Sequence, residues 1–180
     1  MSRDAPVHVL ICGERLRGDD GAAVLAASLL PPDVVALARI TEVGQISPDA
    51  FVAIPPDAPL IVADAAVGIP AGRIVVLALE SLADSAGDGA TPASSHSLPA
   101  RQVLALVSEI RGAPVRGTLI VLGGATFEFG ERLSAPVAAA LPDFTAAIAS
   151  EIRRLTGDRA PGRSISPTSA RRGPLALDCQ

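Results

Sequence analysis

Short apolar runs alternate along the chain with segments whose apolar residues recur at helical spacing. The runs predict strands at Val7–Cys12, Val34–Val43, Leu60–Asp64, Arg73–Leu79 and Thr118–Leu122. The helical spacing predicts helices at Gly21–Leu30, Pro48–Ala53, Leu98–Ile110 and Ser134–Leu155, with Pro142 as the point where the last could break. Buried strands alternating with helices are typical of an α/β fold on a mostly parallel sheet.

The connection between the third and fourth predicted strands fixes the direction of the fourth. Only residues 65–72 separate the two strands, whereas a parallel crossover needs about a dozen residues or more. We therefore expect an antiparallel fourth strand in an otherwise parallel sheet. The stretch Glu80–Ser97 has no periodicity and is expected to carry the chain back to the carboxyl edge, which it can reach at roughly 3.3 Å per residue.

The amino-acid composition disfavours some classes of function. Hydrophobic residues make up 49% of the 180 residues and aromatic residues only 2%, with no Trp or Tyr. The core must therefore be built from Val, Leu, Ile and Ala, which suits a parallel sheet. Scarce aromatics, a net charge of −4 and the lack of a basic patch disfavour nucleic acid and anionic membranes as partners. One domain is expected over residues 1–156, followed by a disordered tail over residues 157–180 that is rich in Pro, Gly, Ser and Arg.

The cysteines and the termini bear on location. Cys12 and Cys179 form neither a disulfide framework nor a CxxC metal pattern. The apolar stretch at the N-terminus is too short for a signal peptide, and no segment approaches the roughly 20 apolar residues of a membrane span. The expected location is the cytoplasm. Cys12 is expected to be a small buried hydrophobic residue, and His8 to be structural.

Polar residues with metal-binding chemistry gather where predicted strands end. Asp19 and Asp20 follow the first strand, Asp64 ends the third, and His96 precedes the helix after the long loop. Open α/β sheets bind ligands at the carboxyl ends of their strands. Two carboxylates and one imidazole would form a site for a divalent transition metal, with open positions for water or substrate.

Each of these residues also has a purely structural interpretation. Asp19 or Asp20 could cap the following helix, Asp64 could end its strand through turn chemistry, and His96 could be a solvated loop residue. The shared edge of the sheet favours the site. Nucleotide-binding and serine-hydrolase motifs (GxGxxG, a Walker sequence, GxSxG) do not occur in the sequence.

Three segments carry a family resemblance. The sequences CGERLRGDDGAAV, LIVADA and SSHSLP, the last before an apolar helix, occur in this order within residues 7–155. Together they resemble the hydrogenase maturation endopeptidases, which process the large subunit of nickel–iron hydrogenases. The resemblance implies a three-layer α/β/α fold of the phosphorylase/hydrolase-like type, with a five-stranded mixed sheet and one antiparallel strand. It also implies that Asp20, Asp64 and His96 match the family's metal-contacting positions, with Asp19 as a capping or supporting neighbour.

The resemblance further implies an activity. The enzyme would remove a short C-terminal peptide from the large-subunit precursor once nickel is loaded, with the nickel supplied by the precursor and not held as a permanent cofactor. No Ser or Cys nucleophile stands out, so an aspartyl-type peptidase is expected, with Asp19, Asp20 or Glu14 as the base that activates water. A monomer is expected. The alternatives are a non-catalytic metal-binding or chaperone-like maturation factor on the same scaffold, or another hydrolase of this fold.

The sequence departs from the family pattern in the first loop. Residues 11–14 are Ile-Cys-Gly-Glu where the family typically has GxGN, so the first Gly and the Asn are replaced. Glu14 adds a negative charge that could serve as an extra ligand, alter substrate choice or mark a divergent member. After the second strand, EVGQISPD retains Gly44 and adds Gln45, a candidate substrate or backbone contact.

Overall fold

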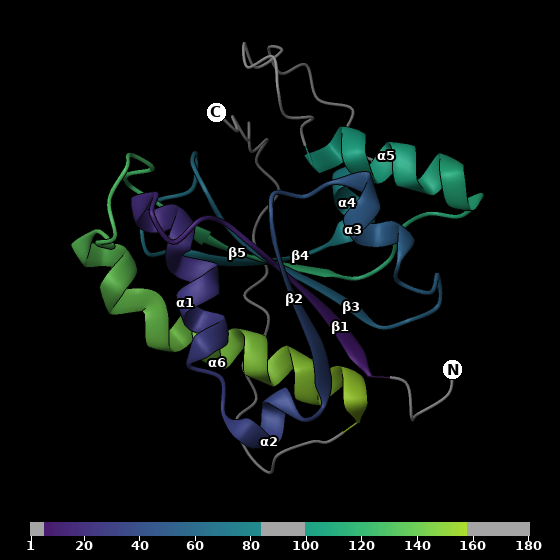
Figure 1. Cartoon of the computed structure of the whole chain (residues 1–180), viewed down its shortest axis with the longest axis horizontal. Coiled ribbons are helices and arrows are strands. Elements are labelled where there is room, and N and C mark those ends of the chain that lie inside the picture. Colours follow the sequence, from purple (N-terminus) through teal and green to yellow (C-terminus); the bar gives the residue numbers. More distant parts are fainter. Residues whose placement is uncertain (1–5, 84–99, 158–180) are drawn as a thin grey trace, which may run out of the picture.

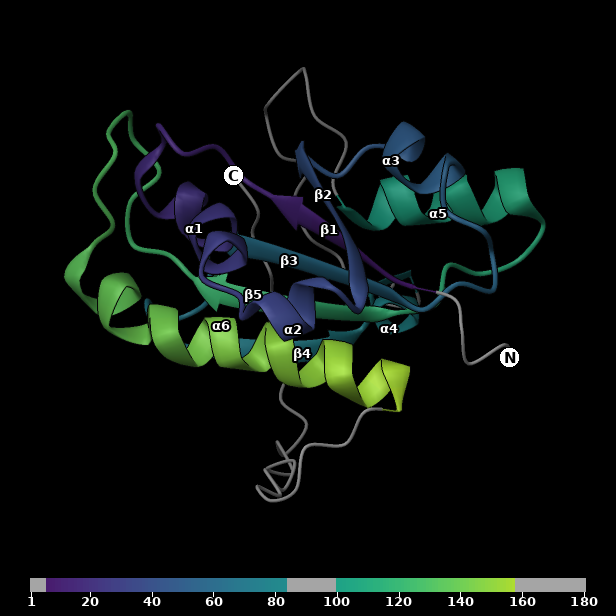
Figure 2. The same ribbon diagram turned by 60° about the horizontal axis from the view of Figure 1, so that its bottom comes forward.

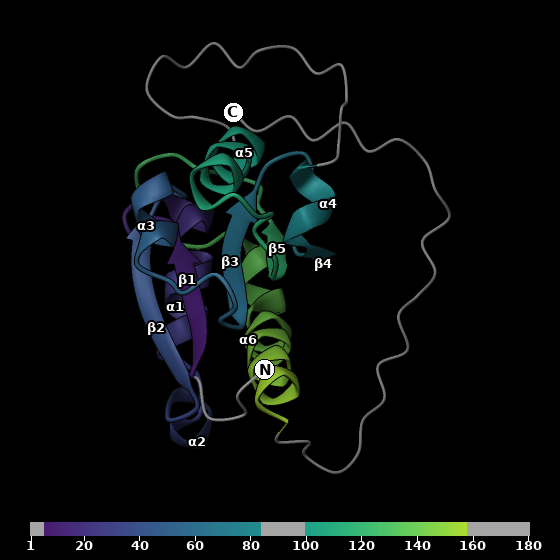
Figure 3. The ribbon, with the colours of Figure 1, turned by 90° about the vertical axis from the view of Figure 1, so that its right-hand side faces the viewer.

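The computed structural model describes residues 6–83 and 100–157, which form a five-stranded sheet in the order β2-β1-β3-β5-β4 (Figure 1). The strands are β1 (Val7–Cys12), β2 (Ala38–Gly44), β3 (Leu60–Ala66), β4 (Ile74–Ala78) and β5 (Thr118–Gly123). All neighbouring pairs are parallel except β4 and β5. The antiparallel fourth strand predicted from the short connection is therefore confirmed, and it lies at one edge of the sheet with β2 at the other (Figure 3).

Helices cover both faces of the sheet, as the three-layer prediction requires (Figure 2). One face packs against α1 (Ala22–Ser28), α2 (Pro32–Val35) and α6 (Ala135–Thr156), and the other against α3 (Pro48–Val52), α4 (Leu79–Ala83) and α5 (Ala100–Arg111). A 3-10 turn, η1 (Gly18–Gly21), precedes α1. None of the helices in the described part of the chain has the length and apolar character that a membrane span requires.

Alternation along the central strands divides the core into two layers. Val9 and Ile11 of β1 belong to the layer beneath α1 and α6, whereas Leu10 and Cys12 belong to the layer beneath α3 and α5. All four side chains are at most 2% exposed. This burial on both faces explains why β1 reads as a continuous apolar run.

Two predicted elements differ from the structure. The strand predicted at Val34–Val43 begins only at Ala38, because Pro32 occupies the first turn of the short helix α2 and Val34 is buried in the core from that helix. Helix α6 is not broken at Pro142. Pro142 lies on the exposed face of α6, where water can satisfy the carbonyl that the proline leaves unpaired. Most of the predicted loop Glu80–Ser97, and the predicted tail beyond Gly157, lie outside the described residues.

The carboxylate of Asp19 joins η1 to the loop between β5 and α6 (residues 124–134). Asp19 is 0% exposed. Its oxygens accept hydrogen bonds from the N–H groups of Ala125 (2.7 Å), Thr126 (3.0 Å) and Ser134 (2.6 Å), and from the Ser134 hydroxyl (2.8 Å). Burial acts to raise the pKa of Asp19, but these hydrogen bonds outweigh it, so the pKa lies below its ordinary value.

We therefore expect Asp19→Ala to destabilise the fold by roughly 2–4 kcal/mol, because it leaves buried donors unpaired. The control is Asp33→Ala, which removes an exposed ion pair with Arg153 (2.8 Å) and should change stability far less, because water screens exposed ion pairs. Urea unfolding at pH 7 measures both variants. Since the folded-state pKa is lowered, the contribution of Asp19 is present above its ordinary pKa and should disappear as the pH falls below it. Equal stabilities of the two variants at pH 7 would contradict this role.

Candidate active site

Asp20 and Asp64 lie near each other at the carboxyl edge of the sheet. The chain leaves β1 for β2 on one side and later returns as β3 on the other, so β1 and β3 flank the point where open α/β sheets bind ligands. Asp20 lies in η1, and Asp64 lies two residues beyond Val62 on the β3 face that packs against α3 and α5. The charge of Asp20 raises the pKa of Asp64. The two carboxylates are therefore within electrostatic reach of each other.

Of the two carboxyl groups, that of Asp64 has the pKa that is shifted further from its ordinary value. Burial is the main cause, the Asp20 charge adds to it, and a hydrogen bond from the Ala65 N–H (2.8 Å) opposes it; together they raise the pKa of Asp64 to about 7. At neutral pH the side chain is thus divided between its protonated and ionised forms. A group with a pKa near the working pH can both take up and release a proton, which suits acid–base catalysis.

The Asp20 carboxylate is held from within its own loop. Its Oδ2 accepts a hydrogen bond from the Glu14 N–H (2.8 Å). Burial is the main cause that raises the pKa of Asp20; the Glu14 hydrogen bond and the charge of Arg17 oppose this effect, and the charge of Glu14 adds to it. Among the described residues, the second oxygen of Asp20 and that of Asp64 accept no hydrogen bond from the protein. Each carboxylate therefore keeps lone pairs that are available to a ligand.

Gly13 permits the close turn that brings Asp20 to this position. Its φ is +106°, and a Cβ there would lie 1.9 Å from the carbonyl oxygen of Asp20. The Gly13 N–H also donates to the carbonyl of Gly44 (2.5 Å), which joins the loop to the end of β2. The family glycine that is missing here is replaced by Ile11, which is 0% exposed in the core. Gly13 is the second glycine of the family pattern. It is the one that the backbone of this loop requires, and the chain retains it.

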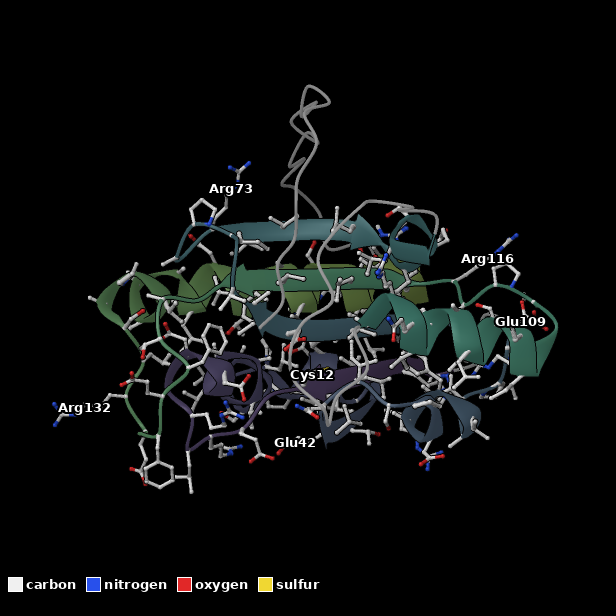
Figure 4. All side chains as sticks on the ribbon, turned by 90° about the horizontal axis from the view of Figure 1, so that it is seen from above. Cys12, Glu42, Arg73, Glu109, Arg116 and Arg132 are labelled. Carbon is white, nitrogen blue, oxygen red and sulfur yellow. The ribbon has the colours of Figure 1, made fainter. Side chains whose placement is uncertain are left out.

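Glu14 borders an open hollow beside the acidic pair. The hollow has a volume of about 490 Å³ and is lined by Gly13, Glu14, Arg15, Leu16, Val24, Glu42 and Gly44. Arg15 and Glu42 form an ion pair across it (3.5 Å). Glu42 belongs to β2, directly beside the carboxyl end of β1, where Cys12 lies (Figure 4). The Glu14 side chain is exposed, so it can reach a water molecule or a substrate in the hollow.

Cys12 is not built to be a nucleophile. It is 1% exposed, and burial, followed by the charges of Asp64 and Asp20, raises the pKa of its thiol far above the ordinary value. The thiol therefore stays protonated at neutral pH, whereas a nucleophilic cysteine reacts as the thiolate. The prediction of a small buried hydrophobic residue fits this environment.

The structure also tests the alternative that Asp19 or Asp20 caps the following helix. Neither Asp19 nor Asp20 forms a side-chain cap on η1 or α1, so that alternative is wrong for both residues. The buried, fully hydrogen-bonded carboxylate of Asp19 is also unsuited to activate water. Sequence reasoning missed the partners of Asp19 in residues 124–134; the only signal was Ser134, which precedes the start of a helix.

Three predicted contacts remain predictions. His96 lies outside the described residues. Within residues 6–83 and 100–157, no group of three or more His, Cys, Asp and Glu side chains could hold a metal ion. Asp20 and Asp64 are the two of the three predicted donors that lie within these residues. Gln45 is exposed and follows Gly44, the last residue of β2, at the same edge of the sheet. Glu14 is exposed at the hollow, and its contact with substrate or metal is likewise untested.

Comparisons with known proteins agree with this fold. The sequence profile of the family described as hydrogenase maturation protease matches residues 32–151, more than half of the chain. The structure of the [NiFe] hydrogenase maturation protease HybD from Thermococcus kodakarensis superposes with a TM-score of 0.60 at 19% identity, covering 79% of this chain and 96% of that chain. For the hydrogenase maturating endopeptidase HybD from E. coli the TM-score is 0.64 at 20% identity, with 83% and 93% covered.

No curated protein matches the chain in sequence. At these identities the solved structures establish the fold alone, and it agrees with the predicted mixed sheet. The profile match extends from α2 to the last turns of α6, and therefore includes Asp64 but not the loop that carries Asp20. Because this match spans more than half of the chain, the protein belongs to the hydrogenase maturation protease family.

Proposed function

We propose that this protein is an endopeptidase that removes the C-terminal extension of a nickel–iron hydrogenase large-subunit precursor after nickel has been inserted. The family supports a peptidase of hydrogenase maturation. The single observation that carries the site is the pair of Asp20 and Asp64 at the carboxyl edge of the sheet, beside an open hollow. The proposed partner is the precursor, the proposed oligomeric state is a monomer, and the proposed compartment is the cytoplasm.

Nickel enters this proposal as part of the substrate. The free oxygens of Asp20 and Asp64 are suitable donors for a divalent cation held by the precursor, and His96 is the proposed third contact. A metal contacting both carboxylates would also offset the effect of the Asp20 charge on Asp64, which is one of the causes of the raised pKa of Asp64. The nickel-loaded precursor would thus bind better than the nickel-free one, and cleavage would wait for loading.

The protein's own groups would carry the proton transfers of hydrolysis. The water oxygen bonds to the scissile carbonyl carbon, the C–N bond breaks, and the leaving amine takes up a proton. Asp19 is too buried to serve as the base. If Asp20 and Asp64 contact the metal, the exposed Glu14 carboxylate is the remaining candidate base in the same loop.

The proposal predicts cleavage that depends on nickel. We expect the protein to shorten the C-terminus of the nickel-loaded precursor, and to leave the nickel-free precursor intact, when both are incubated with it and analysed by mass spectrometry. Asp64→Ala and His96→Ala should each lower the rate at least about 100-fold, because they remove proposed contacts to the metal that orients the scissile segment.

The matched control is Asp57→Ala, an exposed aspartate in the connection that leads into the opposite end of β3. It should cleave at the wild-type rate. Absence of cleavage of the loaded precursor would disprove the protease function, and tight binding without cleavage would identify the maturation factor instead. Full activity of both site variants would disprove the site while leaving the function intact.

The raised pKa of Asp64 predicts an unusual pH dependence of stability. A carboxyl group whose folded-state pKa is about 7, above its ordinary value near 4, destabilises the fold increasingly as the pH rises from about 4 to 7. Asp64→Asn removes this charge, so the variant should be more stable than the wild type at pH 8, by on the order of 1–3 kcal/mol, and nearly equal to it at about pH 3.5, where the carboxyl group is protonated in both the folded and the unfolded state. Urea unfolding at the two pH values measures the difference. The same difference at both pH values would contradict the raised pKa.

A further inference from the structure

Phe129 is exposed in a protein that otherwise buries its aromatic side chains. The chain has four Phe residues and no Trp or Tyr. Phe51 and Phe144 are 0% exposed, and Phe127 packs against the core, whereas Phe129 is 86% exposed. Leaving so large an apolar side chain in water forgoes the stabilisation that its burial would provide. Exposed aromatic residues of this kind are typical of protein interfaces.

A second exposed apolar residue lies beside Phe129. Leu16, in the loop between β1 and η1, is 46% exposed. A parallel bridge pairs Arg17 with Gly130, the residues that follow Leu16 and Phe129. The Gly130 N–H donates to the Leu16 carbonyl (2.8 Å), and the Gly18 N–H donates to the Gly130 carbonyl (2.7 Å). We call Leu16 and Phe129 the apolar tip; the loops that carry it run side by side in Figures 1 and 2.

The apolar tip is held in a fixed position relative to the acidic pair. The loop of Phe129 is fastened by the hydrogen bonds to the Asp19 carboxylate and by a further bond from the Asp19 N–H to the Thr126 carbonyl (2.9 Å). The Phe127 ring packs over Gly124, where a Cβ would lie 2.5 Å from the ring. Asp20 follows Asp19 directly. Preorganisation of this kind lowers the entropy lost when a partner binds.

We propose that the apolar tip is a docking surface for the folded body of the large-subunit precursor, next to the extension that is cleaved. This inference rests on the proposed function. The hollow beside the acidic pair is open, so a protease that cuts one bond of a folded protein needs contacts outside it. The apolar tip supplies them. Leu16 lies in the loop that leads into η1, which carries Asp20, and Phe129 lies in the loop beside it, with the exposed charges of Glu128 and Glu131 on either side.

The chemistry of the tip defines the surface that it fits. An apolar centre within a charged rim matches a shallow apolar depression on the partner. A second copy of the chain is a poorer occupant, because self-association through the tip would cover the edge of the sheet that the substrate must reach. The precursor is the partner whose binding makes use of both the tip and the acidic pair.

Steady-state cleavage of the full-length, nickel-loaded precursor tests this inference. Phe129→Ala should raise KM at least about tenfold while kcat changes less than about twofold, because the tip binds the substrate body without touching the reacting atoms. Leu16→Ala should raise KM less, and Phe129→Leu should stay near the wild type. The control is Leu29→Ala, a 58% exposed leucine just beyond the far end of α1, which should leave KM unchanged. All substituted side chains are exposed, so the variants should unfold at wild-type temperatures.

The outcomes separate this inference from the proposed function. An unchanged KM for Phe129→Ala, or a loss in kcat alone, would overturn the docking surface while the protease function stood. A wild-type dimer in sedimentation experiments that Phe129→Ala converts to monomer would overturn it in favour of self-association. If the wild type binds the loaded precursor without cleaving it, the protease function fails, and the docking surface is then judged by whether Phe129→Ala weakens the measured Kd about tenfold.

Discussion

The hydrogen bonds of the buried Asp19 carboxylate hold together two loops that are far apart in the sequence. The residues that donate to it lie 106 to 115 positions further along the chain. Without this connection, η1 and the loop of residues 124–134 would be joined by backbone hydrogen bonds at the bridge between Arg17 and Gly130 and by the bond from the Asp19 N–H to the Thr126 carbonyl. Because Asp20 is the next residue, the anchor that closes the fold at this edge also sets the position of the proposed active carboxylate. Stability and site geometry therefore depend on the same side chain.

A strained electrostatic arrangement is maintained next to this anchor. Asp19 is surrounded by donors and has a lowered pKa, whereas Asp64 is desolvated near another acidic group and has a pKa raised to about 7. The two environments shift the pKa values of two aspartate carboxyl groups in opposite directions. Such separation is expected where one carboxylate is structural and another takes part in binding or proton transfer. The stability that Asp19 contributes offsets part of the destabilisation that Asp64 introduces at neutral pH.

The sequence predicted the elements whose signals are local and strong. The five apolar runs, the antiparallel fourth strand and the shared edge of Asp20 and Asp64 all follow from periodicity and from the lengths of connections. The predicted element boundaries were wrong where local signals compete. Val34 and Val35 favour a strand, but Pro32 starts a helical turn that buries Val34. The role of Asp19 could not be predicted because its partners are distant in sequence. An aspartate before a helix is interpreted as a helix cap when its distant partners are unknown.

Glu14 stands where the family resemblance predicts Asn. Its backbone N–H and its side-chain charge have separate effects on the site. The hydrogen bond to Asp20 comes from the backbone N–H of Glu14, so any residue other than proline could provide it. The geometry of the loop is therefore independent of the substitution, as Gly13 and its close approach to Asp20 also indicate. What the glutamate changes is charge, because it contributes to the raised pKa of Asp20. A third negative group disfavours ionised carboxylates in the free protein but favours a divalent cation brought by a substrate. Under the proposed function, the substitution would therefore make binding depend more on a metal-loaded partner.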